Sequence, residues 1–273
     1  MNLGEMVQKV QEVCPFPASA RRVAELAKDE SAPIERIAAA IATDAALAAQ
    51  LMRLANSAAF GRTRQITNIE HAVVLIGTDE IGRMAAAMGM LAAFHTKSEL
   101  EFNFHDRAVV AGSLARGLAK KMQGVDPAVA FLAGLLADVG AMACAAVDAA
   151  EYRKIWKSCP DPRAREALEL ARYGATSREI GAELLRRNDL PEIVVSAVGA
   201  AFGDPEASPL GLLTGFCRLA TFSIRDAGGD PAALSEALAA LAAEARFPVP
   251  NDVVFETCVS AAGVALSALR TNR

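Results

Sequence analysis

One carboxylate is the main candidate for a chemical role in this chain. Asp138 is the single ionisable side chain of the apolar stretch from Phe131 to Gly140. A carboxylate in an apolar interior needs a metal ion, an organic cation or several hydrogen-bond donors, because a bare buried charge is strongly unfavourable. The group opposite Asp138 therefore decides whether this part of the chain could perform chemistry.

The element that must position Asp138 is expected to be a buried central helix. Asp126-Pro127 supplies a capping residue and a proline at the first helical position. The residues that follow are apolar nearly all the way round, which is typical of a helix in the core. We expect Asp138 to lie within this helix.

The composition predicts an all-α fold. Hydrophobic residues make up 53% of the 273 residues and aromatic residues only 5%. A chain rich in alanine, leucine and valine favours closely packed helices over a sheet. We find no convincing strand pattern and no repeat of fixed length.

Charge and cysteine content limit the function classes. The formal net charge of −4 argues against a general nucleic-acid or membrane-surface binder, which would usually carry a basic face. The five cysteines show no CxxC spacing, and we recognise no secretory leader before them. We therefore expect reduced thiols in a cytoplasmic protein.

Caps, prolines and glycines predict where the helices begin and end. Capping boxes are expected at Thr67 to Glu70 and at Thr176 to Glu179, and further helices should begin near Pro33, Asp44, Pro191, Pro209 and Pro231. The other expected helices cover about residues 18–27, 79–94, 102–122, 163–173 and 252–270.

Two stretches resemble the HD-related output domain (HDOD) family of bacterial signalling proteins. The first runs from Ile41 through Asn56-Ser57 to Gly77, and the second, Phe131 to Gly140, is similar to the family's GLLHDIG-like stretch. With a weaker match near Gly174 to Phe202, the resemblance covers roughly residues 14–205. It implies a helical N-terminal subdomain over residues 1–96 packed on a degenerate HD-like helical core over residues 97–205, and a role in signal transduction. Residues 206–273 are expected to form helices that pack on the core.

The resemblance also implies which metal ligands are lost. Related HD phosphohydrolases hold a metal ion with histidines and aspartates, because a dication activates bound water and neutralises charge on the phosphoryl group. Carried over position by position, only Asp138 remains of the His-Asp pair. The upstream histidine position falls at or near Arg107. The lost ligand positions are Ala137, Ser177, Ala200 and Ala201. We therefore expect no metal ion, no cofactor and no catalytic residue.

Two pairings remain hypotheses at this point. Arg107 could place its guanidinium where the metal stood and pair with Asp138, because the guanidinium fork suits a carboxylate. The alternative is that Asp138 is a solvated or capping carboxylate. Separately, Arg53, Arg62 and Arg64 flank Asn56 and could form an anion or partner-recognition patch, whereas the alternative is an ordinary solvated surface with Asn56 as an end-of-helix hydrogen bonder.

The leading interpretation is a non-catalytic bacterial signal-transduction module that binds a protein partner or a small nucleotide ligand. There is no Gly-rich phosphate loop. The alternative is a metal-dependent phosphohydrolase or phosphodiesterase with an atypical site built from Asp138, His105 and Asp106. A third reading, a transcriptional regulator, lacks a helix with clustered basic residues. We expect no nucleic-acid and no membrane partner.

Overall fold

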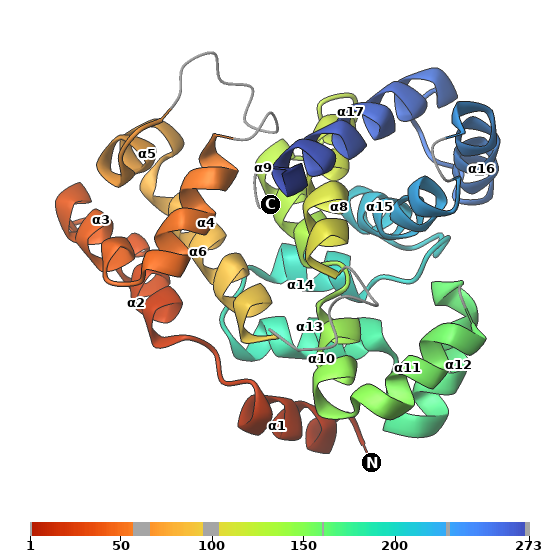
Figure 1. Cartoon of the computed structure of the whole chain (residues 1–273), viewed down its shortest axis with the longest axis horizontal. Coiled ribbons are helices and arrows are strands. Elements are labelled where there is room, and N and C mark those ends of the chain that lie inside the picture. Colours follow the sequence, from red (N-terminus) through yellow and green to blue (C-terminus); the bar gives the residue numbers. More distant parts are fainter. Residues whose placement is uncertain (1, 57–65, 95–103, 160, 228–229, 271–273) are drawn as a thin grey trace. The chain divides into compact units, whose positions relative to one another are not determined.

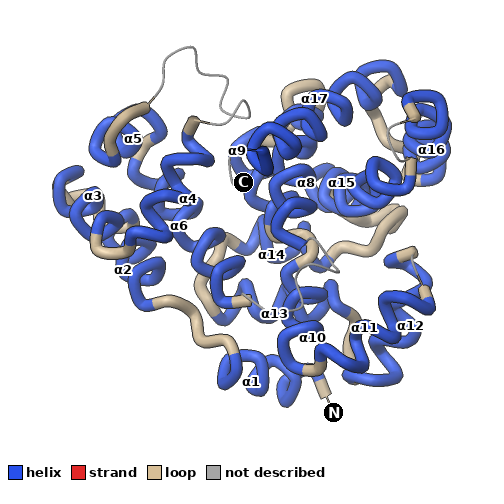
Figure 2. The backbone as a smooth tube through the Cα atoms, viewed as in Figure 1, coloured by secondary structure: helices blue, strands red, loops and turns tan. Residues whose placement is uncertain are grey.

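The computed structural model describes residues 2–56, 66–94, 104–159, 161–227 and 230–270, with the side chains of these ranges up to residue 261 except residue 225. Helices make up all of the regular structure in these ranges (Figures 1 and 2). The all-α class predicted from composition is confirmed.

The chain divides into two compact units. One comprises residues 14–95, and the other comprises residues 1–13 together with residues 96–273. The sequence placed residues 1–96 in one subdomain, but α1 (Leu3–Val13) packs on α10 (Val139–Val147) and α13 (Ser177–Arg187). The first helix is therefore part of the second unit.

The first unit, called here the N-terminal unit, is a set of short amphipathic helices. They are α2 (Ala18–Ala27), α3 (Ile34–Ala42), α4 (Ala45–Ala55), α5 (Ile69–Ile76) and α6 (Thr78–Ala93). Helices α2 and α6 lie against each other at small residues: a Cβ added at Gly82 would be 2.3 Å from the Ala27 methyl carbon. A side chain there would force the two helices apart.

Local sequence signals explain where these helices begin. The Asp44 carboxylate caps α4 by accepting hydrogen bonds from the Ala46 and Leu47 amides. Asn68 caps α5 by accepting from the His71 amide at 2.7 Å. The capping box was predicted to begin at Thr67, so this prediction was wrong by one residue, because the amide oxygen of Asn68 already satisfies the free amide.

The second unit is the larger one and is called here the core unit. After α1 its helices are α8 (Phe104–Ala119), α9 (Pro127–Leu135), α10, α11 (Ala149–Ser158), α12 (Pro162–Tyr173), α13, α14 (Glu192–Gly199), α15 (Pro209–Asp226), α16 (Pro231–Glu244) and α17 (Asn251–Arg270). Helix α8 packs along α9, and both α15 and α17 pack on α8 (Figure 1). The residues after about 205 therefore pack on the same helices as the rest of this unit.

The expected single central helix is two helices. Helix α9 ends at Leu135, α10 begins at Val139, and Asp138 lies in the turn between them. The prediction that Asp138 lies within one continuous helix was therefore wrong. The break lets α10 cross α13 at contact distance: a Cβ on Gly140 would be 1.8 Å from the Ser177 carbonyl oxygen.

Residues 127–147, which contain α9 and α10, are apolar and long enough for a membrane span by length and composition, and 89% of this stretch is buried inside the protein. Among the described ranges, the sharply bent pair α3 and α4 passes the same test only if counted as one span. A core segment of a soluble protein has the same properties.

Candidate functional site

The structure brings Arg107 and Asp138 together. The Nη2 and Nε atoms of Arg107 donate to one oxygen of Asp138, Oδ2, at 2.5 and 3.1 Å. The side chains are only 8% and 11% exposed. Two donors on a single oxygen differ from the fork over both oxygens that the sequence suggested, but they still place a cation directly on the carboxylate.

Aromatic rings hold the guanidinium group of Arg107. Its Cζ lies 3.4 Å from the ring centroid of Phe222, on α15, and 5.3 Å from that of Trp156, on α11. A second guanidinium shares these rings: Cζ of Arg165, on α12, lies 3.8 Å from the Trp156 centroid and 5.2 Å from the Phe222 centroid. Cations over aromatic faces are attracted by the ring quadrupole, more strongly where water is excluded.

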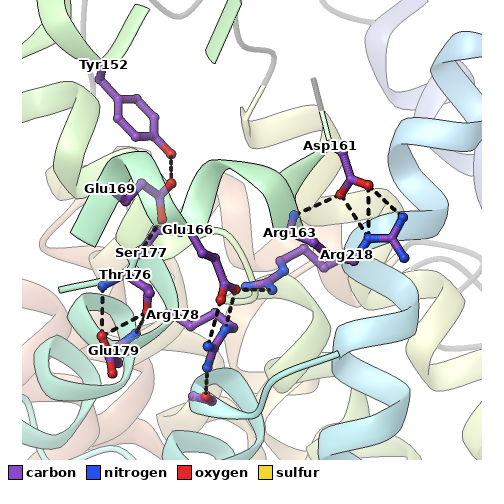
Figure 3. Close-up of polar contacts among 11 residues, drawn as sticks. Tyr152, Asp161, Arg163, Glu166, Glu169, Thr176, Ser177, Arg178, Glu179 and Arg218 are labelled. Atoms are coloured by element: carbon purple, nitrogen blue, oxygen red, sulfur yellow. Dashed lines mark hydrogen bonds and ion pairs between the residues drawn. The ribbon is translucent and has the colours of Figure 1, made fainter. Parts of the chain in front are cut away.

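A second acidic residue organises two further arginines. Glu166, on α12, receives two hydrogen bonds from Arg178, with Nε to Oε1 at 2.5 Å and Nη2 to Oε2 at 2.9 Å (Figure 3). The same arginine also donates to the carbonyl oxygen of Gly199, at the end of α14. Arg218, on α15, lies 3.8 Å from Oε1 of Glu166 and is 5% exposed. Glu166 therefore links α12 to the following helices α13, α14 and α15.

Glu169 is buried and fixes the start of α13. Its two carboxylate oxygens accept from the Tyr152 hydroxyl at 3.0 Å and from the Ser177 amide at 2.7 Å (Figure 3). Burial raises the pKa of the Tyr152 hydroxyl well above its usual value, and the charge of Glu169 raises that pKa further. The tyrosine therefore stays a neutral donor to Glu169.

Helix α12 turns its polar face inward. Arg165, Glu169 and Tyr173 are 2%, 1% and 1% exposed, whereas Leu168 and Leu170 are 42% and 53% exposed. The sequence analysis missed this, because amphipathic helices usually bury the apolar face. The available signal was the spacing of Arg165, Glu169 and Tyr173 at i, i+4 and i+8, which places the three on one face.

The positions of the lost metal ligands do not fit a metal ion. Ala137 lies in the turn before Asp138, Ser177 is the first residue of α13, and Ala200 and Ala201 follow α14. Three of these four carry only a methyl group, and Asp138 is occupied by Arg107. Over the described ranges, which include His105 and Asp106, no group of three or more His, Cys, Asp or Glu side chains could hold a metal ion.

The second predicted patch is only partly described. Arg53 is exposed in the last turn of α4. The Asn56 amide nitrogen donates to the carbonyl oxygens of Met52 and Ile66, and its oxygen accepts from the Ile66 amide at 2.7 Å. Asn56 thus acts as the expected end-of-helix hydrogen bonder. Arg62 and Arg64 lie outside the described residues, so the patch stays a prediction.

Comparison with known proteins places the fold. A family profile for the HDOD domain matches residues 13–201. A protein from Shewanella amazonensis SB2B, provisionally named a phosphohydrolase, is 21% identical with a TM-score of 0.73, and the match covers 95% of each chain. A protein from Marinobacter aquaeolei VT8, provisionally named a signal transduction protein, is 20% identical with a TM-score of 0.66, over 98% of this chain and 60% of that one.

A curated relative is considerably longer than this chain. An uncharacterized protein from Treponema pallidum (strain Nichols) is 23% identical over 200 residues, which are 71% of this chain and 38% of that protein. The chain thus spans less than half of the length of that relative. At these identities the solved structures show a common fold. Because the profile match runs from the end of α1 to just past α14 and covers more than half of the chain, this protein belongs to the HDOD domain family.

Proposed function

We propose that this protein is a non-catalytic signalling module of the cytoplasm in which an arginine has replaced the metal ion of an HD-type site. The observation that carries the proposal is the buried contact of Arg107 with Asp138, the one acidic ligand that the resemblance retains. Support for a signalling role comes from the family itself and from the structural neighbour that is provisionally named a signal transduction protein.

The chemistry of the side chains supports this direction. A metal ion promotes phosphoester hydrolysis because it lowers the pKa of bound water and offers an open coordination site to the phosphoryl oxygen. A guanidinium supplies positive charge, but it keeps its protons at every physiological pH and coordinates no water as a ligand. Arg107 therefore stabilises Asp138 without producing a hydroxide nucleophile.

Metal analysis combined with an activity assay tests the proposal. We expect protein purified without chelator to contain far less than one equivalent of manganese, iron or nickel. We also expect it to hydrolyse bis(p-nitrophenyl) phosphate no faster than the His105→Gln and Asp138→Asn variants. Stoichiometric metal together with hydrolysis that either substitution abolishes would instead support the phosphohydrolase alternative.

The partner-recognition patch requires its own experiment. We expect Arg53→Glu to weaken the capture of a specific protein partner from the native cell, because the substitution reverses a charge on an exposed face of α4. Arg22→Glu, on exposed α2 of the same unit, is the matched control. Equal capture by both variants would exclude Arg53 from the partner surface.

A further inference from the structure

We infer that Arg107, Arg165 and Arg218 form an internal binding site for a small oxyanion, either a carboxylate or a phosphate group carrying about one negative charge. The three guanidiniums come from α8, α12 and α15 of the core unit and gather near Phe222 and Trp156. This site goes beyond the signalling role, and its existence does not depend on that role.

The balance of buried charge is the first observation. Arg107, Arg165 and Arg218 are 7%, 2% and 5% exposed. Asp138 neutralises Arg107, whereas the nearby Glu166 already receives two hydrogen bonds from Arg178. The described cluster also contains Glu169. With Arg178 there are four guanidiniums and three carboxylates, which leaves one positive charge in excess.

The surrounding charges do not remove this excess. Asp161 contributes to the electrostatic environment of Arg165, but it is paired with Arg163 at 2.6 Å, so the two cancel. Glu169 spends its hydrogen-bonding capacity on two neutral donors, the Tyr152 hydroxyl and the Ser177 amide. A buried charge in excess is costly unless a counter-ion reaches it.

Unused donors are the second observation. The Nε and Nη1 atoms of Arg165 and the Nε atom of Arg218 are buried and have no hydrogen-bond partner among the described residues. Buried donors in native proteins nearly always have a partner, and a guanidinium carries five N–H groups that only an acceptor can satisfy. An oxyanion would supply both the missing acceptors and the missing negative charge.

The two inward arginines of α12 and α15 differ from a neighbour with a full partner set. Burial lowers the pKa of the Arg218 guanidinium, although Asp138 and Glu166 act in the opposite direction. The hydrogen bonds from Arg178 to Glu166 raise the pKa of the Arg178 guanidinium despite its burial. Arg218 therefore lacks the compensation that Arg178 receives, which agrees with a ligand on the side of Arg218 and Arg165.

The class of ligand follows from the geometry and the charge. Guanidinium groups match the oxygen atoms of carboxylates and phosphates. One excess positive charge suits a carboxylate or a phosphodiester better than a phosphate dianion. Because all three side chains are more than nine-tenths buried, the site suits a small anion or the anionic end of a larger ligand.

Thermal unfolding of the full chain at constant ionic strength tests the site. Sodium acetate and sodium dimethyl phosphate are the probes, and sodium chloride replaces them in the reference buffer. We expect a saturable rise in Tm with at least one probe, because a ligand that binds only the folded state stabilises it by mass action. The probe that acts at the lower concentration identifies a carboxylate or a phosphodiester as the preferred chemistry.

Matched variants localise the effect. Arg165→Gln and Arg218→Gln should weaken the apparent affinity by about tenfold or more, the effect of losing a charge-assisted hydrogen bond. Arg172→Gln, an exposed arginine on the same helix α12, should keep the wild-type response. If the first two variants fail to fold, NMR of the arginine Nε–H signals of the wild-type chain replaces them, and acetate or dimethyl phosphate should shift a few of these signals in a saturable way.

Two results would overturn the inference. One is a Tm that depends only on ionic strength and not on the identity of the anion. The other is an equal loss of response in Arg172→Gln and Arg165→Gln. Neither result affects the metal analysis, so the oxyanion site and the proposed signalling function can fail separately.

Discussion

The two units use polar side chains in different ways. In the N-terminal unit they lie mainly at helix ends: Asp44 and Asn68 cap helices and Asn56 holds Ile66. In the core unit Arg107, Arg165, Glu169 and Arg218 are buried inside. Among the described residues of the N-terminal unit, Glu80 is the one charged residue buried to the same degree.

This difference has an energetic consequence. Caps at the surface stabilise one helix each and are screened by water, so their loss is local. A buried charge depends on its partner, because the medium around it cannot replace that partner. The core unit therefore holds interactions whose state a ligand or a binding partner can change, and the N-terminal unit mainly provides a stable arrangement of helices.

The largest expected effect is the loss of the Asp138 charge. We expect Asp138→Asn to lower the free energy of unfolding by about 3–5 kcal/mol, because Arg107 would remain buried without its counter-charge. Urea unfolding followed by far-UV circular dichroism measures this. The double variant Arg107→Met with Asp138→Leu should lose much less, and an equal loss in both variants would contradict the argument.

Alkaline pH should unfold the core unit through its tyrosines. Burial raises the pKa of Tyr152 and of Tyr173, the two tyrosines of the chain. A raised pKa means that the stabilisation is complete below the unfolded pKa of about 10 and is lost as pH rises above it, at about 1.4 kcal/mol per pH unit for each tyrosine. Absorbance at 295 nm should show tyrosinate only together with the loss of helix. Tyrosinate that forms in the folded chain would contradict this.

Removal of one donor to Glu169 should have an intermediate effect. We expect Tyr152→Phe to lower the free energy of unfolding by about 1–3 kcal/mol, because a buried carboxylate oxygen loses its hydrogen bond while the ring still fills its space. Tyr173→Phe is the matched control, since no hydrogen bond from the Tyr173 hydroxyl is found within the described ranges. A larger loss in the control would sink the assignment.

The smallest effect is expected in the N-terminal unit. Asp44→Ala should lower the free energy of unfolding by about 1 kcal/mol through the loss of the α4 cap. Hydrogen bonds from the Leu47 amide and then the Ser19 hydroxyl lower the pKa of Asp44, so its stabilisation is present above the unfolded pKa and is lost as pH falls through the lower folded value. The acid unfolding curve should therefore differ less between Asp44→Ala and the wild type as pH falls. A cost equal to that of Asp138→Asn would remove the contrast between the two units.

Local signals made most of the helices predictable. The start of α13 at Thr176, the start of α15 at Pro209 and the end of α12 at Gly174 follow from cap, proline and glycine chemistry at each position. Those signals lie within a few residues of the feature that they determine. They could not place Asp138, because the break between α9 and α10 depends on the crossing of α10 over α13 at Gly140.

The candidate site was less predictable for the same reason. Arg107 and Asp138 could be paired through the family resemblance, but Arg165 and Glu169 were missed. Their burial is set by the aromatic rings of Trp156 and Tyr152 on a neighbouring helix. Periodicity shows which residues of α12 share a face, but it does not show which face turns inward when the apolar residues are few.

The position of Trp156 makes the core unit readable by light. It is the single tryptophan of the chain, and the guanidinium groups of Arg107 and Arg165 both lie against its ring. All indole fluorescence of the protein therefore originates beside these two cations. A shift in the emission maximum or intensity reports their rearrangement directly, with no label attached.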